Sequence, residues 1–341
     1  MLRVLGIILA VLCTAAAAVL TFPGVFRVDR YFPVAQIVSF RGLVAVAFFA
    51  AAFVALLLMI ARPLRALGLA LAVVAGAAGV ANVVILTSRG LGTEELPAQT
   101  DTSIRVMTWN TAGDATPPDA IAQMAVAMSA DVVTLPETTI ETGEQVAILM
   151  RDLGRPMWAH HVNNPSTVWD AGSTTILIAP ELGDYSVIES SRDGSSNTST
   201  VPSAVAMPTS GEGPIIVAAH AVAPRPSAMQ SWRNDLQWLA DQCADANVIM
   251  AGDFNATLDH MTGLGVDGGT MGLCHDAAAE TGNGAIGTWT TALPPLAGAP
   301  IDHVMTSPHW QATGSLVVRS LDGSGSDHRP LVVQLEPVAD R

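Results

Sequence analysis

The sequence predicts an α/β protein whose sheets are covered by helices and are preceded by three transmembrane helices. The first 90 residues contain three long windows without a charged residue. From residue 103 onward, short β-type runs alternate with helical stretches. The polar segment 91–102 between these regions is typical of a linker. We therefore expect a membrane anchor over residues 1–90 and a large α/β domain over residues 103–338.

The charge-free windows cover residues 4–26, 42–61 and 66–88, which are 23, 20 and 23 residues long. A helix of about 20 apolar residues crosses a bilayer. The third window is rich in alanine and glycine, which favours close helix packing in lipid. Buried helices of a soluble core are the alternative, but three such windows joined by short links with arginine and proline do not suit a globular core.

The orientation of these helices follows from the charges that flank them. Arg3 and the turn with Arg62 and Arg65 favour a cytoplasmic N-terminus, whereas three arginines of the first loop argue the other way. Arg3, the apolar run and the alanines at 15–18 also fit a cleaved signal peptide. With the first segment either kept or cleaved, we expect a multi-pass protein of the cell membrane whose large domain is extracytoplasmic.

The charge of the chain excludes several chemistries. All 16 basic residues are arginine, so lysine-dependent phosphate loops, Schiff-base enzymes and pyridoxal-phosphate anchors are excluded. Residues 101–341 carry nine arginines against 27 acids, a net charge of −18. This charge disfavours non-specific binding to nucleic acid, although it does not exclude a phosphate substrate that a metal ion bridges.

Periodicity assigns the elements of the large domain. We expect helices at 118–128, 141–153 and 228–242. We expect strands at 104–109, 131–135, 174–178, 185–189, 203–207, 215–220, 248–251, 303–306, 316–318 and 331–335. His160 and His161 are expected in an exposed loop. Cys243 and Cys274 either form one disulfide or stay as two buried thiols, and both alternatives remain open at this point.

Apolar strands of the large domain repeatedly end in, or follow, a polar side chain. Six strands carry such residues, which can assemble into one site at one rim: Asn110, Glu137, His220, Asp253 with Asn255, Asp302, and Asp327 with His328. Each residue alone has an ordinary explanation as a turn, a cap or a core histidine. The occurrence of all these residues together favours a functional site, because unrelated turns would not place chemically complementary groups at the ends of successive strands.

The side chains in this set suit a hard metal ion. Carboxylate and amide oxygens favour Mg²⁺, with Mn²⁺ or Ca²⁺ as alternatives, over zinc. Two imidazoles add proton transfer and stabilisation of developing negative charge. Together these groups suit hydrolysis of a phosphoester by water.

The ordered motifs resemble the endonuclease/exonuclease/phosphatase superfamily over roughly residues 103–336. The resemblance rests on Trp109-Asn110, Leu135-Pro136-Glu137, Ala219-His220, Gly252-Asp253-Phe254-Asn255, Gly287-Thr288-Trp289, Ile301-Asp302-His303 and Ser326-Asp327-His328-Arg329-Pro330. The three preceding helices are similar to a membrane-anchored bacterial branch of that family. The resemblance implies a deoxyribonuclease-like, four-layered α/β sandwich with two central sheets.

The resemblance also implies a role for each residue of the site. Glu137 is expected as the principal metal ligand, and Asn110 and Asp327 are expected to complete or support the metal shell. Asp253 and Asn255 would orient water and phosphate, and His220 would contact a phosphate oxygen. Two further residues act together: Asp302 would hold the tautomer of the essential imidazole of His328. The general base is either Asp253 or His328.

One position departs from the pattern of the family, because Pro136 stands where glutamine commonly precedes the metal-binding glutamate. Glu137 itself is retained, so we expect altered local geometry and retained metal binding. The residues and the resemblance together indicate a membrane-anchored, metal-dependent phosphoester hydrolase. Its substrate would be a lipid head group, a nucleotide or a nucleic acid, and no protein partner is implied. The rival hypothesis is a non-catalytic, membrane-tethered binding module with the same fold.

Overall fold

The computed structural model describes the chain except residues 1, 94, 165–171, 189–196, 245–246 and 339–341. The described chain forms two compact units, Met1–Arg89 and Gly90–Arg341. Glu189, at the end of the strand expected over 185–189, lies outside the described residues.

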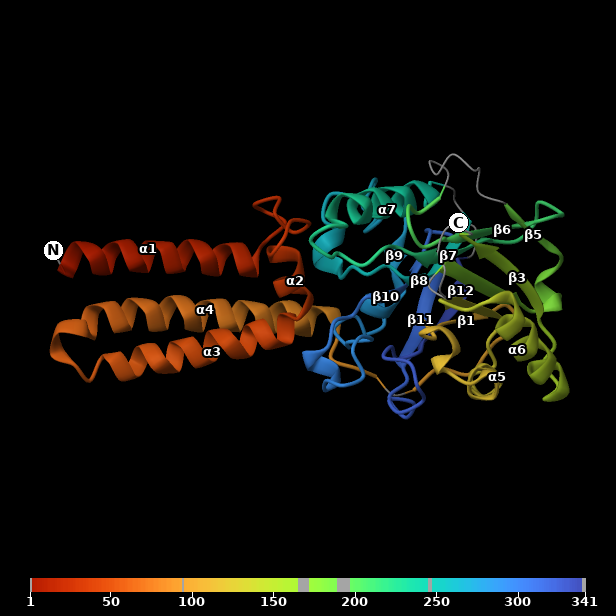
Figure 1. The fold of residues 1–341 in the computed structure, drawn as a ribbon, viewed down its shortest axis with the longest axis horizontal. Coiled ribbons are helices and arrows are strands. Elements are labelled where there is room, and N and C mark those ends of the chain that lie inside the picture. Colours follow the sequence, from red (N-terminus) through yellow and green to blue (C-terminus); the bar gives the residue numbers. More distant parts are fainter. Residues whose placement is uncertain (1, 94, 165–171, 189–196, 245–246, 339–341) are drawn as a thin grey trace. The chain divides into compact units, whose positions relative to one another are not determined.

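The first unit is helical, as its apolar composition predicts. It consists of α1 (Leu2–Thr21), α2 (Val34–Ser39), α3 (Arg41–Leu58), the 3₁₀ turn η1 (Arg62–Leu64) and α4 (Arg65–Arg89) (Figure 1). Prolines at 23, 33 and 63 lie in the connections, where a missing backbone donor does no harm. By length and composition, three stretches could cross a membrane: Val4–Thr21, Arg41–Leu58 and Arg62–Arg89. The short helix α2 is not predicted, since six residues are too few for a clear period.

A buried polar cluster joins the three long helices of this unit. The Arg41 guanidinium donates to Asn82 Oδ1 at 2.6 Å and to the Thr21 carbonyl at 3.2 Å. Asn82 Nδ2 donates to Thr21 Oγ1 at 3.2 Å, and all three residues are buried. Such hydrogen bonds fix how apolar helices pack, because each group would otherwise be unsatisfied in an apolar surrounding.

The second unit contains two six-stranded sheets. The first sheet has the strand order β11-β12-β1-β2-β4-β3, with β1 (Ile104–Thr108), β2 (Val132–Pro136), β3 (Trp158–Asn163), β4 (Ser173–Ile178), β11 (Trp310–Val317) and β12 (Leu331–Pro337). The second has the order β5-β6-β7-β8-β10-β9, with β5 (Tyr185–Ile188), β6 (Ala204–Pro208), β7 (Ile215–His220), β8 (Val248–Asp253), β9 (His275–Asp276) and β10 (Asp302–Thr306).

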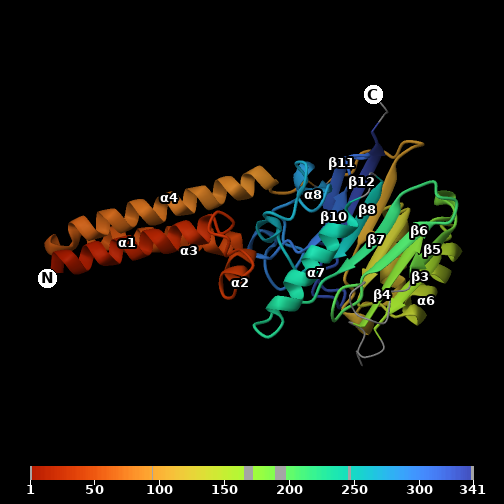
Figure 2. The same ribbon diagram turned by 90° about the horizontal axis from the view of Figure 1, so that it is seen from above.

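The two sheets pack face to face and helices cover their outer faces. One apolar core lies between the sheets, where Val106, Ile176, Ile216 and Ile249 are buried. A second core lies between the first sheet and helices α5 (Pro118–Ala127) and α6 (Ile140–Asp152). Helix α7 (Met229–Gln242) lies against the second sheet, as Figure 2 shows, whereas the short helix α8 (Ala277–Glu280) contacts both β10 and β11, and its alanines belong to the core between the sheets. This arrangement confirms the four-layered α/β sandwich.

The structure corrects two expectations about single elements and adds a short strand that the sequence does not predict. His160 and His161 lie on the edge strand β3, not in a loop. Its burial does not alternate, because three half-buried residues follow the exposed Trp158 and precede the buried Val162, and its residues show no period of two in the sequence either. Strand β11 begins at Trp310 and is interrupted by a bulge between Ala312 and Gly314, which hides its period. The two-residue strand β9 is too short to detect.

Residues 90–93, at the start of the second unit, hydrogen-bond to other parts of that unit. Gly92 N donates to the Gly282 carbonyl at 2.9 Å. Asn283 Nδ2 donates to Thr93 Oγ1 at 2.6 Å and to the Ser315 carbonyl at 2.9 Å. Residues 90–93 are therefore part of the folded domain, although the polar composition of 91–102 is typical of a linker.

The structure decides between the two cysteine alternatives, because Cys243 and Cys274 form a disulfide with a Cα–Cα distance of 5.7 Å. A crosslink that closes a loop of 31 residues restricts the unfolded chain and contributes about 4 kcal/mol. We expect reduction, or the double change Cys243→Ala and Cys274→Ala, to lower the free energy of unfolding by about that amount in a urea titration. Cys13→Ala is the control. An unchanged urea midpoint in the double variant would contradict the crosslink.

Tyr185 provides a pH-dependent test of the second sheet. Its buried hydroxyl donates to the Pro214 carbonyl at 3.1 Å, and burial raises the pKa of Tyr185 to about 12. The unfolded pKa is about 10, so this contribution to stability is complete below pH 10 and is lost between pH 10 and 12. We expect an extra loss of about 1 kcal/mol between pH 9 and 11, relative to Tyr185→Phe. Equal losses in urea titrations of both proteins would refute this expectation.

Candidate functional site

The ends of strands from both sheets meet at one place. In the second sheet, His220 at the end of β7 pairs with Asp253 at the end of β8, and Asp253 pairs with Asp302 at the start of β10. In the first sheet, β1 and β2 run parallel, so the residues after them, Asn110 and Glu137, lie at one edge. The register of both sheets therefore brings the predicted residues together.

Asn110 connects the two sheets through its side-chain amide. Its Nδ2 donates to Glu137 Oε1 at 3.1 Å and to Asp253 Oδ2 at 3.0 Å. Its Oδ1 accepts from the Ala112 backbone N–H at 3.0 Å, which fixes the orientation of the amide. Asn110 therefore presents a donor to two carboxylates, and its oxygen is occupied by the backbone.

Backbone conformation places two of the side chains. Glu137 has φ 58° and Asn255 has φ 48°, the left-handed region in which residues other than glycine carry a steric cost. Such strained positions cluster at functional sites. Gly252 allows β7 and β8 to approach, because a Cβ there would lie 1.9 Å from the Ala219 carbonyl oxygen. The turn at 252–255 thus aims Asp253 and Asn255 at the edge of the sheet.

The Asp253 carboxylate accepts three amide hydrogen bonds. Besides the bond from Asn110, the Asn255 backbone N–H donates to Oδ1 at 2.8 Å and Asn255 Nδ2 donates to Oδ2 at 3.0 Å. Burial raises the pKa of Asp253 to about 7, although His328 and these amides favour the charged form. Asn255 Nδ2 also donates to the Ala221 carbonyl at 2.9 Å, which joins the loop to the end of β7.

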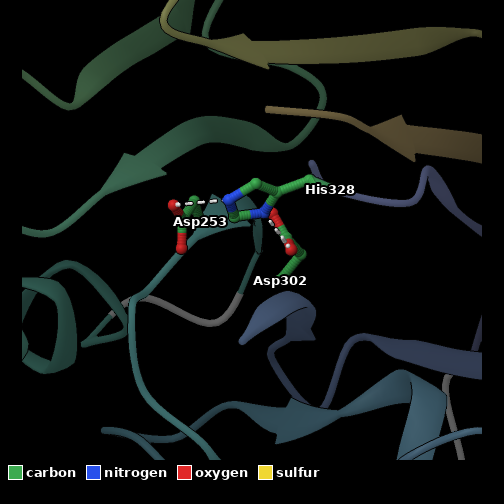
Figure 3. Close-up of side chains that lie close together, drawn as sticks. All are labelled: Asp253, Asp302 and His328. Carbon is green, nitrogen blue, oxygen red and sulfur yellow. Dashed lines mark hydrogen bonds and ion pairs between the residues drawn. The ribbon is translucent and has the colours of Figure 1, made fainter. Parts of the chain in front are cut away.

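His328 lies between two buried carboxylates (Figure 3). Its Nδ1 is 2.8 Å from Asp302 Oδ2, and its Nε2 is 3.9 Å from Asp253 Oδ2. Burial alone would lower the pKa of His328, but the charges of Asp302 and Asp253 outweigh burial and raise it to about 10. The ring is therefore protonated at neutral pH and donates to Asp302.

His220 has the opposite electrostatic environment. Burial, together with the charge of His328, lowers the pKa of His220 to about 3, so the ring is neutral. Its Nε2 lies 3.8 Å from Glu137 Oε1. Among the described residues, the buried Nδ1 has no hydrogen-bond partner. The site thus contains one protonated and one neutral imidazole.

Asp327 lies at the exposed rim, with 56% of its side chain accessible. Its Oδ2 accepts from the Trp289 indole N–H at 2.8 Å, and its Oδ1 lies 3.9 Å from His328 Nε2. The structure therefore places Asp327 beside the imidazole of His328, while Glu137 contacts Asn110 and His220.

Several residues that support the site are not among those predicted as functional. Thr288 Oγ1 accepts from the Asp302 backbone N–H at 3.0 Å, and Ser326 Oγ accepts from the His328 N–H at 2.9 Å. Trp289 holds Asp327, and Ser203 Oγ accepts from the His220 N–H at 2.9 Å. Thr288, Trp289 and Ser326 stand in the motifs quoted above, so the sequence could have indicated them. Ser203 has no such signal.

The profile of the Endonuclease/Exonuclease/phosphatase family matches residues 107–328, which spans the site and more than half of the chain. The chain belongs to the endonuclease/exonuclease/phosphatase family. No curated protein matches the chain. Enzymes of this family use divalent metals, and this chain has the family's hydrolase fold. The buried Asp253, Asp302 and His328 each offer a ligand atom within 4.8 Å of the others, so this group could hold a metal ion.

Solved structures share the fold at low sequence identity. An endonuclease/exonuclease/phosphatase from Beutenbergia cavernae DSM 12333 is similar with TM-score 0.52 and 19% identity, covering 69% of this chain and 72% of that one. TDP2 from D. rerio, complexed with a single-strand DNA product, gives TM-score 0.53 and 18% identity, covering 69% and 100%. A family protein from Leptotrichia buccalis C-1013-b gives 0.52 and 13%, covering 68% and 99%.

Proposed function

We propose that the protein is a membrane-anchored, divalent-metal-dependent phosphoester hydrolase that attacks phosphate with an activated water. The observation that carries this proposal is the bridge of Asn110 between Glu137 of one sheet and Asp253 of the other. This bridge brings a partly exposed carboxylate, a buried carboxylate and two imidazoles of opposite protonation into one site. Such a combination suits acid–base chemistry on a phosphate.

Glu137 is the proposed principal ligand of Mg²⁺, with Mn²⁺ or Ca²⁺ as alternatives. Its side chain is 24% accessible, and its carboxylate offers hard oxygen atoms of the kind that Mg²⁺ prefers. Asn110 supports the ligand through its amide, and Asp327 completes the set from the rim. His328 is the weaker candidate for a ligand, because its Nδ1 is taken by Asp302 and its Nε2 faces carboxylates. A bound ion would supply positive charge to the phosphate oxygens.

The remaining residues are assigned to general-base catalysis and to stabilisation of the phosphate. Asp253 accepts three amide hydrogen bonds and lies beside Asn255, which suits a base that orients the attacking water. Asp302 holds His328 through Nδ1, which leaves the Nε2 proton for a phosphate oxygen. The neutral His220 provides a second contact for phosphate. We therefore assign the base to Asp253 and the stabilising cation to His328.

Several classes of phosphoester are candidate substrates. TDP2 from D. rerio is seen with a single-strand DNA product, which supports a phosphodiester as one substrate class. The net charge of −18 over residues 101–341 disfavours tight binding of duplex DNA. We therefore propose three classes of substrate, which are lipid head groups, nucleotides and single-stranded nucleic acid.

A substrate panel tests the proposed function. Full-length protein in detergent is assayed on phosphodiesters and phosphomonoesters with Mg²⁺, with Mn²⁺ and with chelator. We expect turnover of at least one substrate that disappears with the chelator and returns when metal is added. Turnover that survives chelation contradicts the metal requirement. Absence of turnover on every substrate favours the rival, a binding module that retains the fold.

We further propose that residues 1–90 span the bilayer of the cell membrane and that the domain over 103–338 is extracytoplasmic. Three apolar helices of sufficient length support the first part. The Cys243–Cys274 disulfide supports the second, because disulfides persist in oxidising compartments. A reporter fused after Arg341 tests it: we expect a periplasm-active reporter to function, and a reporter active only in the cytoplasm would overturn the assignment.

A further inference from the structure

Arg329 is a buried arginine directly after His328, and only 1% of it is accessible to solvent. Its guanidinium donates through Nε and Nη2 to the two carboxylate oxygens of Asp322, both at 2.8 Å. Nη1 donates to the Gly287 carbonyl at 2.8 Å. Nη2 also donates to the Leu293 carbonyl at 2.8 Å and the Thr291 carbonyl at 3.3 Å. One side chain thus holds both ends of segment 287–293.

Segment 287–293 carries the groups that orient two carboxylates of the site. Thr288 Oγ1 accepts from the backbone N–H of Asp302 at 3.0 Å. The Trp289 indole donates to Asp327 Oδ2 at 2.8 Å. The Arg329 backbone N–H donates to the Thr288 carbonyl at 2.8 Å, so the loop that carries His328 before β12 is attached to the same segment. The position of the segment therefore determines where both carboxylates lie relative to His328.

The chemistry of the contacts requires arginine. The Asp322 carboxylate takes two parallel hydrogen bonds from the planar guanidinium, and three backbone carbonyls accept from Nη1 and Nη2. A lysine keeps the charge, but its ammonium has three donors and cannot reproduce a bidentate pair together with carbonyls on both sides. The carbonyls would lose buried donors, which favours a shift of the segment.

We propose that Arg329 is a positioning residue of the hydrolytic site, which fixes segment 287–293 so that Asp302 and Asp327 stand correctly beside His328. This inference rests on the proposed function, because it assigns Arg329 a part in that reaction. Arg329 does not touch the reacting atoms and acts through Thr288 and Trp289. Its loss therefore lowers the rate of the chemical step more than it weakens substrate binding.

Arg105 supplies a control, because it is a half-buried arginine that donates to several partners, as the fully buried Arg329 does. It donates to the Gln334 side chain at 3.0 Å, to the Met128 carbonyl at 2.9 Å and to the Pro97 carbonyl at 2.6 Å. These contacts lie at the start of β1, whereas Asn110 follows its other end. Arg105→Lys should therefore cost stability without moving the site.

The kinetic test compares Arg329→Lys, Asp322→Asn and Arg105→Lys in the full-length protein, with the melting temperature of each. We expect kcat to fall about 10- to 100-fold in Arg329→Lys, and by a smaller factor in Asp322→Asn, while KM changes less than about threefold. We expect Arg105→Lys to keep the parental kcat. Parental kcat in Arg329→Lys, or an equal loss of kcat in Arg105→Lys at a similar melting temperature, would overturn the proposal.

A second measurement separates this proposal from the proposed function. The chain contains seven tryptophans, which can be replaced by 5-fluorotryptophan, and Trp289→Phe assigns the ¹⁹F signal of Trp289. We expect that signal to move in Arg329→Lys and to stay in Arg105→Lys. This measurement does not require turnover. An inactive parent protein would therefore contradict the proposed function and would leave the positioning role of Arg329 testable. A stationary Trp289 signal in Arg329→Lys would overturn the positioning role even if the parent is active.

Discussion

Glu137→Gln is expected to lower metal-dependent turnover by about 100-fold or more. The change keeps the size of the side chain but removes the charge of the proposed principal ligand. It also alters the acceptor of the Asn110 amide at 3.1 Å and the partner 3.8 Å from His220 Nε2. Removing one preorganised hydrogen-bond donor from an active site typically costs about 10²–10³ in rate, and we expect loss of the charge of a metal ligand to cost at least as much. The measurement is kcat at saturating substrate over a titration of Mg²⁺.

Glu144→Gln is the matched control for this change, because Glu144 is an exposed carboxylate on α6. We expect it to keep the parental rate and the parental Mg²⁺ requirement. Added Mg²⁺ should partly restore a Glu137→Asp variant, since that carboxylate is retained. A Glu137→Gln protein that keeps the parental rate would contradict the role of Glu137 as the principal metal ligand.

Asp302→Asn is expected to lower kcat by about 10²- to 10⁴-fold while the protein stays folded. Asp302 Oδ2 is 2.8 Å from His328 Nδ1, and its charge is the largest of those that raise the pKa of His328. An amide there removes that charge and no longer favours the protonated ring. The measurement is kcat against pH, together with the melting temperature. His328→Gln should cause a loss of similar size.

Asp119→Asn serves as the control for loss of a carboxylate, because Asp119 is exposed in the first turn of α5. The double variant Asp302→Asn/His328→Gln is the sharper test. We expect it to be no worse than either single variant, since both changes disable one unit. Independent, multiplying losses would show that Asp302 and His328 do not act together.

The sequence predicts most of the fold because its elements carry strong local signals. The strands β7 and β8 are continuous apolar runs, and buried parallel strands have this pattern. The polar residues at strand ends follow from the same pattern, because a buried strand can tolerate Asp253 or His220 only where it ends. Strands β3 and β9 were not predicted, since an edge strand and a two-residue strand are defined by their partners.

The site is predictable in its residues but not in its hydrogen bonds. Nothing in the sequence shows that the Asn110 oxygen is taken by Ala112, which leaves the amide nitrogen for the carboxylates. The contacts of Arg329 with Asp322 and Gly287 likewise depend on loops that meet only in the folded chain. The pairing of Cys243 with Cys274 could not be chosen from spacing, because free thiols are equally compatible with burial.

The most direct test of the central claim is the fate of oxygen in hydrolysis in H₂¹⁸O with Mg²⁺. If a water oriented at Asp253 attacks phosphorus, one ¹⁸O appears in the phosphate product and none in the leaving alcohol. Formation of labelled phosphate should stop when chelator is added, and it should slow in parallel with turnover in Glu137→Gln and Asp302→Asn. Label in the alcohol, or ¹⁸O incorporation that continues without metal, would contradict metal-dependent attack of water on phosphate at this site.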